Sequence, residues 1–596
     1  MSTLTHASPL RRPVRAARTK AGTVLVLVVV MVVALLVSAA APSSAAAANK
    51  SWTVMIYEDA DNTLETLGPT DFINEMCKPG SGSNVNVVSL FDRGSVKDTT
   101  YGGWTDTKLF YCVAGETPTA ANAVADWGER DMGSAQTLID FVNYCKANYP
   151  ADHYVLCFWD HGYCWYPGYY IVRDDTSVSS LDMDKQAAAL AATGGVDVIA
   201  CDQCQMQMVE DLSVWQQAGC KAVAASEDTV NDTGLDYGSM GADLQANPTW
   251  TPEQVANDIG QKATGFAGND SYTYSTVQLD SRFDALKAAV NDLGAAMRAG
   301  LPANKTAYAT AWSNTKGFDD ASEKDLYDAA AKIKAAVADT TIQAKCDAVM
   351  AAVTTAVTYN WNCGGKWVNA HGLAIWWPKS SLDFSGNSNK IDDWAYYRTQ
   401  LPFGATNAWS SFLGASILAD YVAPTTTSNV DSAWHTTSPV TVSFTGTDNS
   451  GGSGIFNTQY SLDGGAWTTG TSVVVSADGD HSLLYRSSDR AANYETSHSA
   501  EVKIDTTAPS TTDNSDGLPH HAFTLMLSPS DAASGVAFTE YRIDGGSWET
   551  GTSVRLVRAI RHKLAGLSRG GHVIEYDSTD NAGLVESVKS CTVTLF

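Results

Sequence analysis

Two short apolar segments, each ending abruptly in polar residues, constrain the fold of this chain more than any other feature. The segments are Tyr154–Trp159 and Val196–Cys201, and His161 and Cys204 follow them closely. Segments of this kind form strands buried on both faces of a parallel sheet. The site of an open α/β sheet lies outside the carboxyl ends of its strands. The pattern therefore predicts that His161 and Cys204 meet in space as a nucleophile–base pair.

The surrounding sequence alternates between strand-like and helix-like segments from Trp52 to about Leu418. This alternation predicts an α/β region with a parallel sheet and right-handed crossovers. The expected strands also include 52–57, 85–90, 221–225 and 372–378, and the expected helices are one capped by Ser134 and ending before Pro150, 181–192, 206–217, and most of 280–360.

Position relative to the strands separates the three histidines of this region. His153 and His371 precede their strands and should point to the opposite edge of the sheet, whereas His161 follows one. Cys204 is expected to begin a helix, and a helix N-terminus lowers the pKa of a thiol. A buried inert cysteine, or a disulfide with Cys201, is the structural alternative.

The residues of the predicted nucleophile–base pair could instead belong to a metal site or a redox motif. Cys157, His161, Cys201 and Cys204 could supply four zinc ligands. The single Cys-x-x-Cys motif is weak evidence, because residues 157 and 201 should point sideways from buried strands. A redox motif is disfavoured, since that pair usually begins a helix near the N-terminal βαβ unit.

The sequence after Pro424 is rich in Ser, Thr, Gly and Asp and contains two repeats. Tyr460–Trp467 recurs as Tyr541–Trp548, 81 positions later, and Tyr485–Asp489 recurs as Tyr576–Asp580, 91 positions later. The second copy therefore holds about ten extra residues between the motifs. Alternating apolar residues around Asp-Gly-Gly turns are typical of hairpins, and units of this size predict β-sandwiches.

Length and charge limit the function classes. A chain of 596 residues should form three or four domains. A net charge of −26 argues against nucleic-acid binding, because phosphates would be repelled. The eleven cysteines leave at least one thiol unpaired, and we expect Cys204 to be free.

The N-terminus, residues 1–48, is typical of a signal peptide. Basic residues between Arg11 and Lys20 precede an apolar run, Ala21–Val37, and alanine-rich cleavage sites. An uncleaved membrane anchor is the alternative. We expect a secreted, extracellular protein, with the possibility of attachment to the cell surface.

Several motifs together resemble the clostripain-like cysteine peptidases. The resemblance covers roughly residues 50–415, in five stretches that occur in the family's order. These stretches are Trp52–Tyr57 with Ala60-Asp61-Asn62-x-Leu64-Glu65, Trp159-Asp-His161-Gly162-x-x-Trp165, Asp197 to Glu210 around Cys204, Ala225-Ser226-Glu227, and Gly372 to Pro378.

This resemblance implies a caspase-like fold, with a mostly parallel sheet flanked by helices. The implied domains are the peptidase, residues 50–418, and two all-β immunoglobulin-like sandwiches, residues 424–506 and 507–596. The resemblance also implies a His161–Cys204 dyad that hydrolyses peptide bonds after Arg or Lys. The backbone N–H groups of Gly162 and Cys204 would form the oxyanion hole.

Acidic residues near the dyad are candidates for the pocket that binds a basic side chain. Asp202 is the first candidate, and Asp228 or Glu227 could contribute. Asp202 could instead cap the following helix.

Self-cleavage between His161 and Cys204 also occurs in related enzymes. Only Arg173 and Lys185 are basic in this interval, and Arg173 lies in a polar break suited to an exposed loop.

The chemistry requires no cofactor, and no metal ligand is assigned. Calcium dependence occurs in the family, and the acidic stretch of Asp174, Asp175, Asp182 and Asp184 could bind Ca²⁺, although a solvated surface is the default interpretation.

The sequence departs from the family at three positions near the dyad. Gln203 stands where a small residue is usual, Gln205 where an apolar one is, and Cys164 replaces a small residue. The family resemblance therefore does not determine the detailed shape of the substrate pocket around these three residues.

Three functions compete on this evidence. The first is a secreted cysteine endopeptidase acting on proteins or peptides with basic residues. The second is a catalytically inactive adhesin on the same scaffold, against which the intact dyad argues. The third is a glycan-binding or glycan-active protein that contacts cell wall or glycans through the β repeats, but the α/β region has no paired-carboxylate site.

Overall fold

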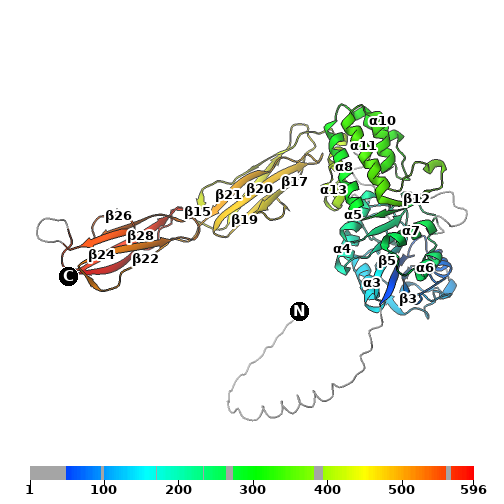
Figure 1. The fold of residues 1–596 in the computed structure, drawn as a ribbon, viewed down its shortest axis with the longest axis horizontal. Helices are drawn as coiled ribbons and strands as arrows, with labels where there is room; N and C mark the ends of the chain where they lie inside the picture. Colours follow the sequence, from blue (N-terminus) through cyan, green and yellow to red (C-terminus); the bar gives the residue numbers. More distant parts are fainter. Residues whose placement is uncertain are drawn as a thin grey trace, which may run out of the picture. The chain divides into compact units, whose positions relative to one another are not determined.

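A nine-stranded mixed sheet forms the centre of the α/β region (Figure 1). Its order is β12-β10-β9-β8-β5-β1-β2-β3-β4. The pairs β1–β2, β5–β8 and β8–β9 are parallel, as predicted, whereas the outer pairs are antiparallel. The strands are β1 (Lys50–Asp59), β2 (Val85–Arg93), β3 (Asp106–Tyr111), β4 (Ala125–Gly128), β5 (Ala151–Trp159), β8 (Val198–Asp202), β9 (Ala222–Ala225), β10 (Thr273–Gln278) and β12 (Val357–Asn362).

The structure is a computed structural model that describes residues 49–94, 99–168, 171–231, 234–263, 273–380, 393–558 and 566–596. The predicted signal peptide, residues 1–48, lies outside these ranges. Within them, no helix has both the length and the apolar composition needed to cross a membrane.

Helices cover both faces of the sheet and create two separate cores. The larger core lies under α3, α4, α5 and α8, and the smaller one under α6 and α7. Ser134 caps α3 as predicted, because its hydroxyl accepts a hydrogen bond from the Gln136 N–H. The helices are α3 (Ala135–Asn148), α4 (Met183–Thr193), α5 (Val209–Gln217), α6 (Tyr237–Ala246), α7 (Pro252–Ala263) and α8 (Ser281–Ala299).

The other helices and strands of the α/β region pack around the central sheet and its helices. The expected strand at 372–378 is shorter than predicted and lies outside the main sheet, since β13 forms a two-stranded sheet with β11. The elements are α2 (Gly68–Asp71), the π-helix Phe72–Met76, the 3₁₀ turns Thr100–Gly102 and Gly365–Trp367, β6 (Arg173–Asp174), β7 (Ser179–Ser180), α9 (Lys305–Asn314), β11 (Glu323–Asp325), α10 (Leu326–Ala336), α11 (Thr340–Ala356), β13 (Ala374–Trp376), α12 (Asp393–Thr399), α13 (Pro402–Thr406) and α14 (Ala408–Leu418).

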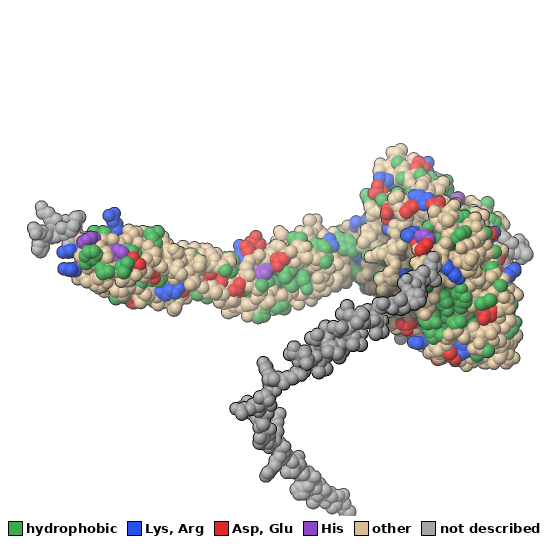
Figure 2. Space-filling model, turned by 60° about the horizontal axis from the view of Figure 1, so that its bottom comes forward, with side chains coloured by type: hydrophobic (Ala, Val, Ile, Leu, Met, Phe, Trp, Pro, Cys, Tyr) green, Lys and Arg blue, Asp and Glu red, His purple; other side chains and the backbone are tan. Residues whose placement is uncertain are grey.

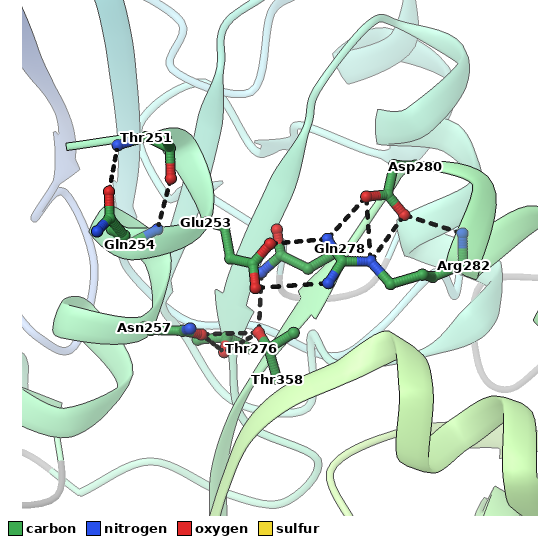
Figure 3. A network of polar contacts seen from close by, with 9 residues as sticks. All are labelled: Thr251, Glu253, Gln254, Asn257, Thr276, Gln278, Asp280, Arg282 and Thr358. Atoms are coloured by element: carbon green, nitrogen blue, oxygen red, sulfur yellow. Dashed lines mark hydrogen bonds and ion pairs between the residues drawn. The ribbon is translucent and has the colours of Figure 1, made fainter. Parts of the chain in front are cut away.

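A polar network joins the β10–β12 edge of the central sheet to helix α7 (Figure 3). Asp280 caps α8, and Arg282 pairs with both Asp280 and Glu253 of α7 at 2.7 and 2.8 Å. Asn257 of α7 accepts a hydrogen bond from Thr358 of β12 at 2.7 Å. The strands β10 and β12 are thereby held to α7, which Arg282 joins to α8.

The C-terminal sequence repeats fold into two all-β units with the same topology. Each unit has a three-stranded and a five-stranded sheet around its own apolar core. The first unit contains β14 (Thr425–Ser428), β15 (Trp434–His435), β16 (Val440–Thr447), β17 (Ile455–Leu462), β18 (Thr468–Thr469), β19 (Ser472–Val475), β20 (Gly479–Asp489) and β21 (His498–Ile504). The second contains β22 (Ser510–Asp513), β23 (Pro519–His520), β24 (Ala522–Ser530), β25 (Val536–Ile543), β26 (Glu549–Thr550), β27 (Ser553–Val557), β28 (Gly570–Asp580) and β29 (Lys589–Leu595).

We call these units repeat 1 and repeat 2. The ten extra residues of repeat 2 fall between β27 and β28, because β19 and β27 start 81 positions apart and β20 and β28 start 91 apart. The fold thus confirms an α/β region followed by all-β units.

Charged side chains of both signs lie on the surface of the protein (Figure 2). On the face drawn in Figure 2, Lys and Arg side chains are scattered among Asp and Glu side chains. A basic groove of the kind that binds nucleic acid is not seen on that face.

Candidate active site

The register of two parallel strands brings the predicted pair together. Trp159, the last residue of β5, lies opposite Asp202, the last residue of β8. His161 and Cys204 each come two residues later, so they leave neighbouring strands at equivalent positions. Adjacent strands lie about 4.8 Å apart. Both residues line one cavity of about 260 Å³.

The two loops touch at Gly162. A methyl group at this position would lie 2.3 Å from the Cys204 carbonyl oxygen and 3.0 Å from the Cys204 amide nitrogen. A side chain cannot be placed there without moving one loop. Glycine at 162 is therefore a requirement of close backbone approach.

Three neighbours position His161. The Thr63 hydroxyl lies 2.8 Å from Nε2, the buried Asp160 carboxylate accepts a hydrogen bond from the His161 N–H at 2.5 Å, and the Gln203 amide donates to the His161 carbonyl at 2.7 Å. Thr63 could not be predicted as a site residue, because it occupies an unspecified position in its motif. Gln203, noted only as a departure from the family, ties the His161 loop to the Cys204 loop.

Cys204 lies in a turn, and the prediction that it begins a helix is wrong. Helix α5 starts at Val209, and a left-handed residue, Gln205 with φ of 59°, redirects the chain first. The thiol therefore gains nothing from a helix N-terminus. Burial instead raises its pKa to about 11, while the Val230 N–H, 3.2 Å from Sγ, opposes this shift. Cys204 is a free thiol, as predicted.

Asp202 lines the same cavity as the pair. Its Oδ2 accepts hydrogen bonds from the Leu235 N–H at 3.0 Å and the Tyr237 hydroxyl at 3.1 Å. Burial raises the pKa of this carboxyl to about 6. The alternative role as a cap of the following helix is excluded, because α5 begins after Met208 and receives no side-chain cap.

The other acidic candidates lie outside the residues that line the cavity. Asp228 accepts a hydrogen bond from the Trp367 indole at 2.5 Å and lies 4.0 Å from the Lys316 ammonium. Glu227 accepts a hydrogen bond from the Gly372 N–H at 3.0 Å. Both carboxylates bind neighbouring segments of the fold, although Thr229 and Val230, which follow them, do reach the cavity.

Arg173 lies at the start of the β6–β7 hairpin rather than in an open loop. Its side chain is about one-third exposed and pairs with Asp175 at 2.8 Å. Its N–H donates to the Asp160 carboxylate, and Asp174 after it is buried. Lys185, the other basic residue in the interval, donates to the carbonyls of Gly133 and Ser180.

The zinc alternative fails on geometry. Cys157 belongs to the smaller core and Cys201 to the larger one, so their side chains lie on opposite faces of the sheet. In the described part of the chain, every group of side chains spaced to hold a metal consists of carboxylates. The predicted disulfide alternative between Cys201 and Cys204 is also not formed.

The predicted acidic stretch does not converge on one site. Asp175 pairs with Arg173, Asp182 accepts from the Gly168 N–H, and Asp184 accepts from the Tyr396 hydroxyl. Asp174 alone joins a group spaced for a cation. That group consists of Asp61, Asp92, Glu129 and Asp174.

Comparison with known sequences identifies relatives of this region. The model of the clostripain family matches residues 56–416. Clostripain from Hathewaya histolytica is 30% identical over an alignment of 195 residues, and the match covers 27% of this chain and 35% of clostripain. The chain thus spans about a third of the length of that relative.

Two solved structures are also similar. A secreted C11 cysteine protease from Bacteroides thetaiotaomicron, bound to an irreversible peptide inhibitor, is 18% identical, covers 60% of this chain and 98% of its own, and gives a TM-score of 0.45. An inactive zymogen C11 protease from Parabacteroides distasonis is 18% identical, covers 60% and 97%, and gives 0.44.

Proposed function

This chain belongs to the clostripain family of peptidases, and from that premise we propose that it is a secreted cysteine endopeptidase that cleaves after Arg or Lys. The observation that carries the proposal is the register of β5 and β8. Because of this register, His161 and Cys204 each follow the end of a neighbouring strand by two residues, and both line one cavity. Protein or peptide substrates follow from the family.

In the proposed mechanism, Cys204 attacks the scissile carbonyl and His161 protonates the leaving amine. The Gly162 and Cys204 N–H groups would stabilise the oxyanion. The close approach of the Gly162 backbone to Cys204 supports this assignment, because it brings the two residues side by side. Water would hydrolyse the acyl-enzyme after His161 removes its proton.

The Cys204 thiol must lose its proton before it can attack the substrate. With a pKa raised to about 11 by burial, Cys204 is protonated at neutral pH. Its activation then requires His161 to remove the proton. Cleavage after Arg173 would open the β6–β7 hairpin and release the Asp160 carboxylate from the Arg173 N–H.

We assign the binding of the basic substrate side chain to Asp202. Its Oδ2 is bound by Leu235 and Tyr237, and its Oδ1 accepts no hydrogen bond from a described residue. A guanidinium or ammonium group that reaches Oδ1 would gain a charge-assisted hydrogen bond in a buried site. Asp228 stays outside this proposed pocket, because its carboxylate is bound to Trp367.

The dyad needs no cofactor for its chemistry, and calcium enters only as a modulator. The group of Asp61, Asp92, Glu129 and Asp174 is the place in the α/β region where we propose that Ca²⁺ binds. Asp92 Oδ2 there is buried without a hydrogen-bond partner in the described chain. Chelation should then lower the peptidase activity.

Secretion and the partners of the β repeats complete the proposal. The N-terminal sequence supports export, and the repeats are proposed as contacts with cell wall or glycans. An adhesin without catalysis on this scaffold is the alternative, and activity measurements separate the two.

The test uses fluorogenic peptides ending in Arg, Lys, Leu or Asp under reducing conditions, with and without Ca²⁺. The mature chain should cleave after Arg or Lys, and Cys204→Ala should not. Cys591→Ala, which removes a thiol from repeat 2, is the matched control and should keep full activity. Equal cleavage by wild type and Cys204→Ala would refute the proposal.

A further inference from the structure

Both β repeats carry a triad of aspartates at equivalent places. Repeat 1 has Asp420, Asp448 and Asp489, and repeat 2 has Asp505, Asp531 and Asp580. In each triad the first Asp begins an Asp-x-x-Ala-Pro segment, the second lies in the loop before the second long strand, and the third ends the third long strand. Within each triad the carboxylate oxygens lie within 4.8 Å of one another.

The same backbone hydrogen bonds hold the first Asp of each triad. Asp420 Oδ2 accepts from the Ser453 N–H at 2.7 Å, and Asp505 Oδ2 accepts from the Ser534 N–H at 3.0 Å. These bonds fix the carboxylate against the loop that carries the second Asp.

The second and third Asp are held in parallel ways. Asp448 and Asp531 accept from the N–H groups of Gly454 and Gly535 at 2.6 and 2.7 Å. Asp489 Oδ1 and Asp580 Oδ1 each accept from the N–H four residues later, at 2.8 and 2.9 Å. The two triads therefore share one scaffold.

One position distinguishes the triads. In repeat 1, the Asn493 amide donates to Asp489 Oδ2 at 2.6 Å and to the Asp420 carbonyl at 3.2 Å. The equivalent residue in repeat 2 is Leu584, which has no amide to donate. Asp580 is 2% exposed, and its Oδ2 is buried without a hydrogen-bond partner among the described residues.

This unsatisfied oxygen belongs to a triad that has no counter-charge. Asp505 is buried and Asp531 is half-buried, and no Lys, Arg or His of the described chain pairs with the three. A buried carboxylate without a partner is costly, so such groups are usually paired or bind a metal. In repeat 1, where the amide is present, burial and then the charges of Asp420 and Asp448 still raise the pKa of Asp489 to about 6.

The dimensions suit a hard divalent cation. Calcium binds six to eight oxygen ligands at about 2.3–2.6 Å. Oxygens on opposite sides of one ion are then about 4.6–5.2 Å apart, which accommodates the separation of up to 4.8 Å within the triad. Carboxylate oxygens that accept one N–H bond keep a second lone pair for the ion.

We propose that Asp505, Asp531 and Asp580 bind a calcium ion in repeat 2, and that Asn493 takes the place of the ion in repeat 1. Asp505 follows β21, the last strand of repeat 1, and its N–H donates to the His435 carbonyl of that repeat at 2.9 Å. The ion therefore ties the segment that connects the repeats to two loops of repeat 2.

The test is calorimetric titration of Ca²⁺ into the full mature chain, in the Cys204→Ala background and with excess Mg²⁺. Asp580→Asn keeps Oδ1 for the Leu584 N–H but removes the charge. We expect one Ca²⁺ site fewer per chain than in the parent, or an affinity at that site lower by about tenfold or more. The thermal transition of repeat 2 should lose the same part of its calcium dependence.

Two matched variants keep the test decisive. Leu584→Asn supplies the amide that repeat 1 has and should weaken the same site, whereas Asp489→Asn in repeat 1 should leave Ca²⁺ binding unchanged. A parent chain that binds no Ca²⁺, or identical isotherms for the parent, Asp580→Asn and Leu584→Asn, would overturn the proposal. Binding confined to the Asp61–Asp174 group gives such identical isotherms. Folding of each variant is checked by near-ultraviolet circular dichroism without Ca²⁺.

Discussion

The central sheet and the β repeats bury their strands in different ways. Every residue of β2 and β8 is buried, because helices cover both faces of the sheet. In β16 and β19 buried and exposed residues alternate, since one face of each small sheet is open to solvent. Parallel sheets covered by helices and antiparallel sheets with one wet face differ in this way in general.

This difference determines where each region can carry chemistry. A strand buried on both faces can present reactive groups only where it ends, and His161 and Cys204 lie just beyond the ends of β5 and β8. In the repeats, buried charged side chains lie near the loops, as Asp505 and Asp580 do. The variants that follow test whether catalysis depends on residues at the carboxyl ends of the strands.

The largest effect is expected for His161→Ala. Loss of the proton-transfer group should lower kcat/KM by about a thousandfold or more. His153, near the start of the same strand, is the matched control. It stacks on Trp52 at 4.7 Å, so His153→Ala should reduce stability but not activity. Equal losses in the two variants would mean that the carboxyl ends of the strands have no special role.

Gly162→Ala comes next. Its methyl group would lie 2.3 Å from the Cys204 carbonyl oxygen, so the two loops must separate. Misplacing one oxyanion donor should lower kcat by about a hundredfold or more. In Gly571→Ala, the control, the nearest atom is 3.4 Å away, and activity should not change. Stopped-flow acylation rates distinguish this loss from weaker substrate binding.

Asp202→Asn should change specificity more than rate. Removing the buried charge should lower the Arg-to-Leu ratio of kcat/KM by about 10- to 100-fold. Asp228→Asn should leave that ratio unchanged, because Asp228 is bound to Trp367 outside the cavity. A shifted ratio in Asp228→Asn alone would move the pocket to the other carboxylate.

The dependence of kcat/KM on pH tests the assignment of Asp202 in a second way. Burial raises the pKa of Asp202 to about 6, so the carboxyl is neutral below that pH and charged above it. For Arg substrates, kcat/KM of the wild type should fall as pH drops through about 6. The Arg-to-Leu ratio of kcat/KM cancels the contribution of His161, which acts on both substrates. In Asp202→Asn this ratio should not change across pH 6, and an equal change in both proteins would contradict the assignment.

The smallest effect is expected for Gln203→Ala. It removes the 2.7 Å hydrogen bond to the His161 carbonyl, a bond worth about 1 kcal/mol, or about fivefold in rate if the His161 loop shifts. Gln343→Ala removes a comparable bond to the Val337 carbonyl and is the control. A positioning role predicts a change in kcat with little change in KM, whereas a purely structural role would lower the melting temperature alone.

Much of this arrangement can be predicted from the sequence, because the pattern of apolar residues shows which positions are buried. The apolar segments before His161 and Cys204 predict the two strands, and the repeated Asp-Gly-Gly turns predict the β units. The position of Cys204 relative to α5 could not be predicted, because Gln205 adopts a left-handed conformation without being glycine. Propensity rules give no signal for such a residue.

Hydrogen bonds between residues far apart in the chain could not be predicted from the sequence either. The bonds from Thr63 and Gln203 to His161 join segments far apart in the chain, and nothing local marks them. The antiparallel edges of the sheet were missed for a related reason. The connection between β2 (ending at Arg93) and β3 (beginning at Asp106) is about a dozen residues long, the lower limit for a crossover between parallel strands, so its length leaves both strand directions open.

The most direct test of the central claim is the site of covalent labelling by an irreversible peptidyl inhibitor with Arg next to its reactive group. Peptide mapping by mass spectrometry should find the label on Cys204 in the wild type and a much slower reaction in His161→Ala and Asp202→Asn. Labelling of another cysteine, or labelling of Cys204 at the same rate in all three proteins, would contradict a site built from the ends of β5 and β8.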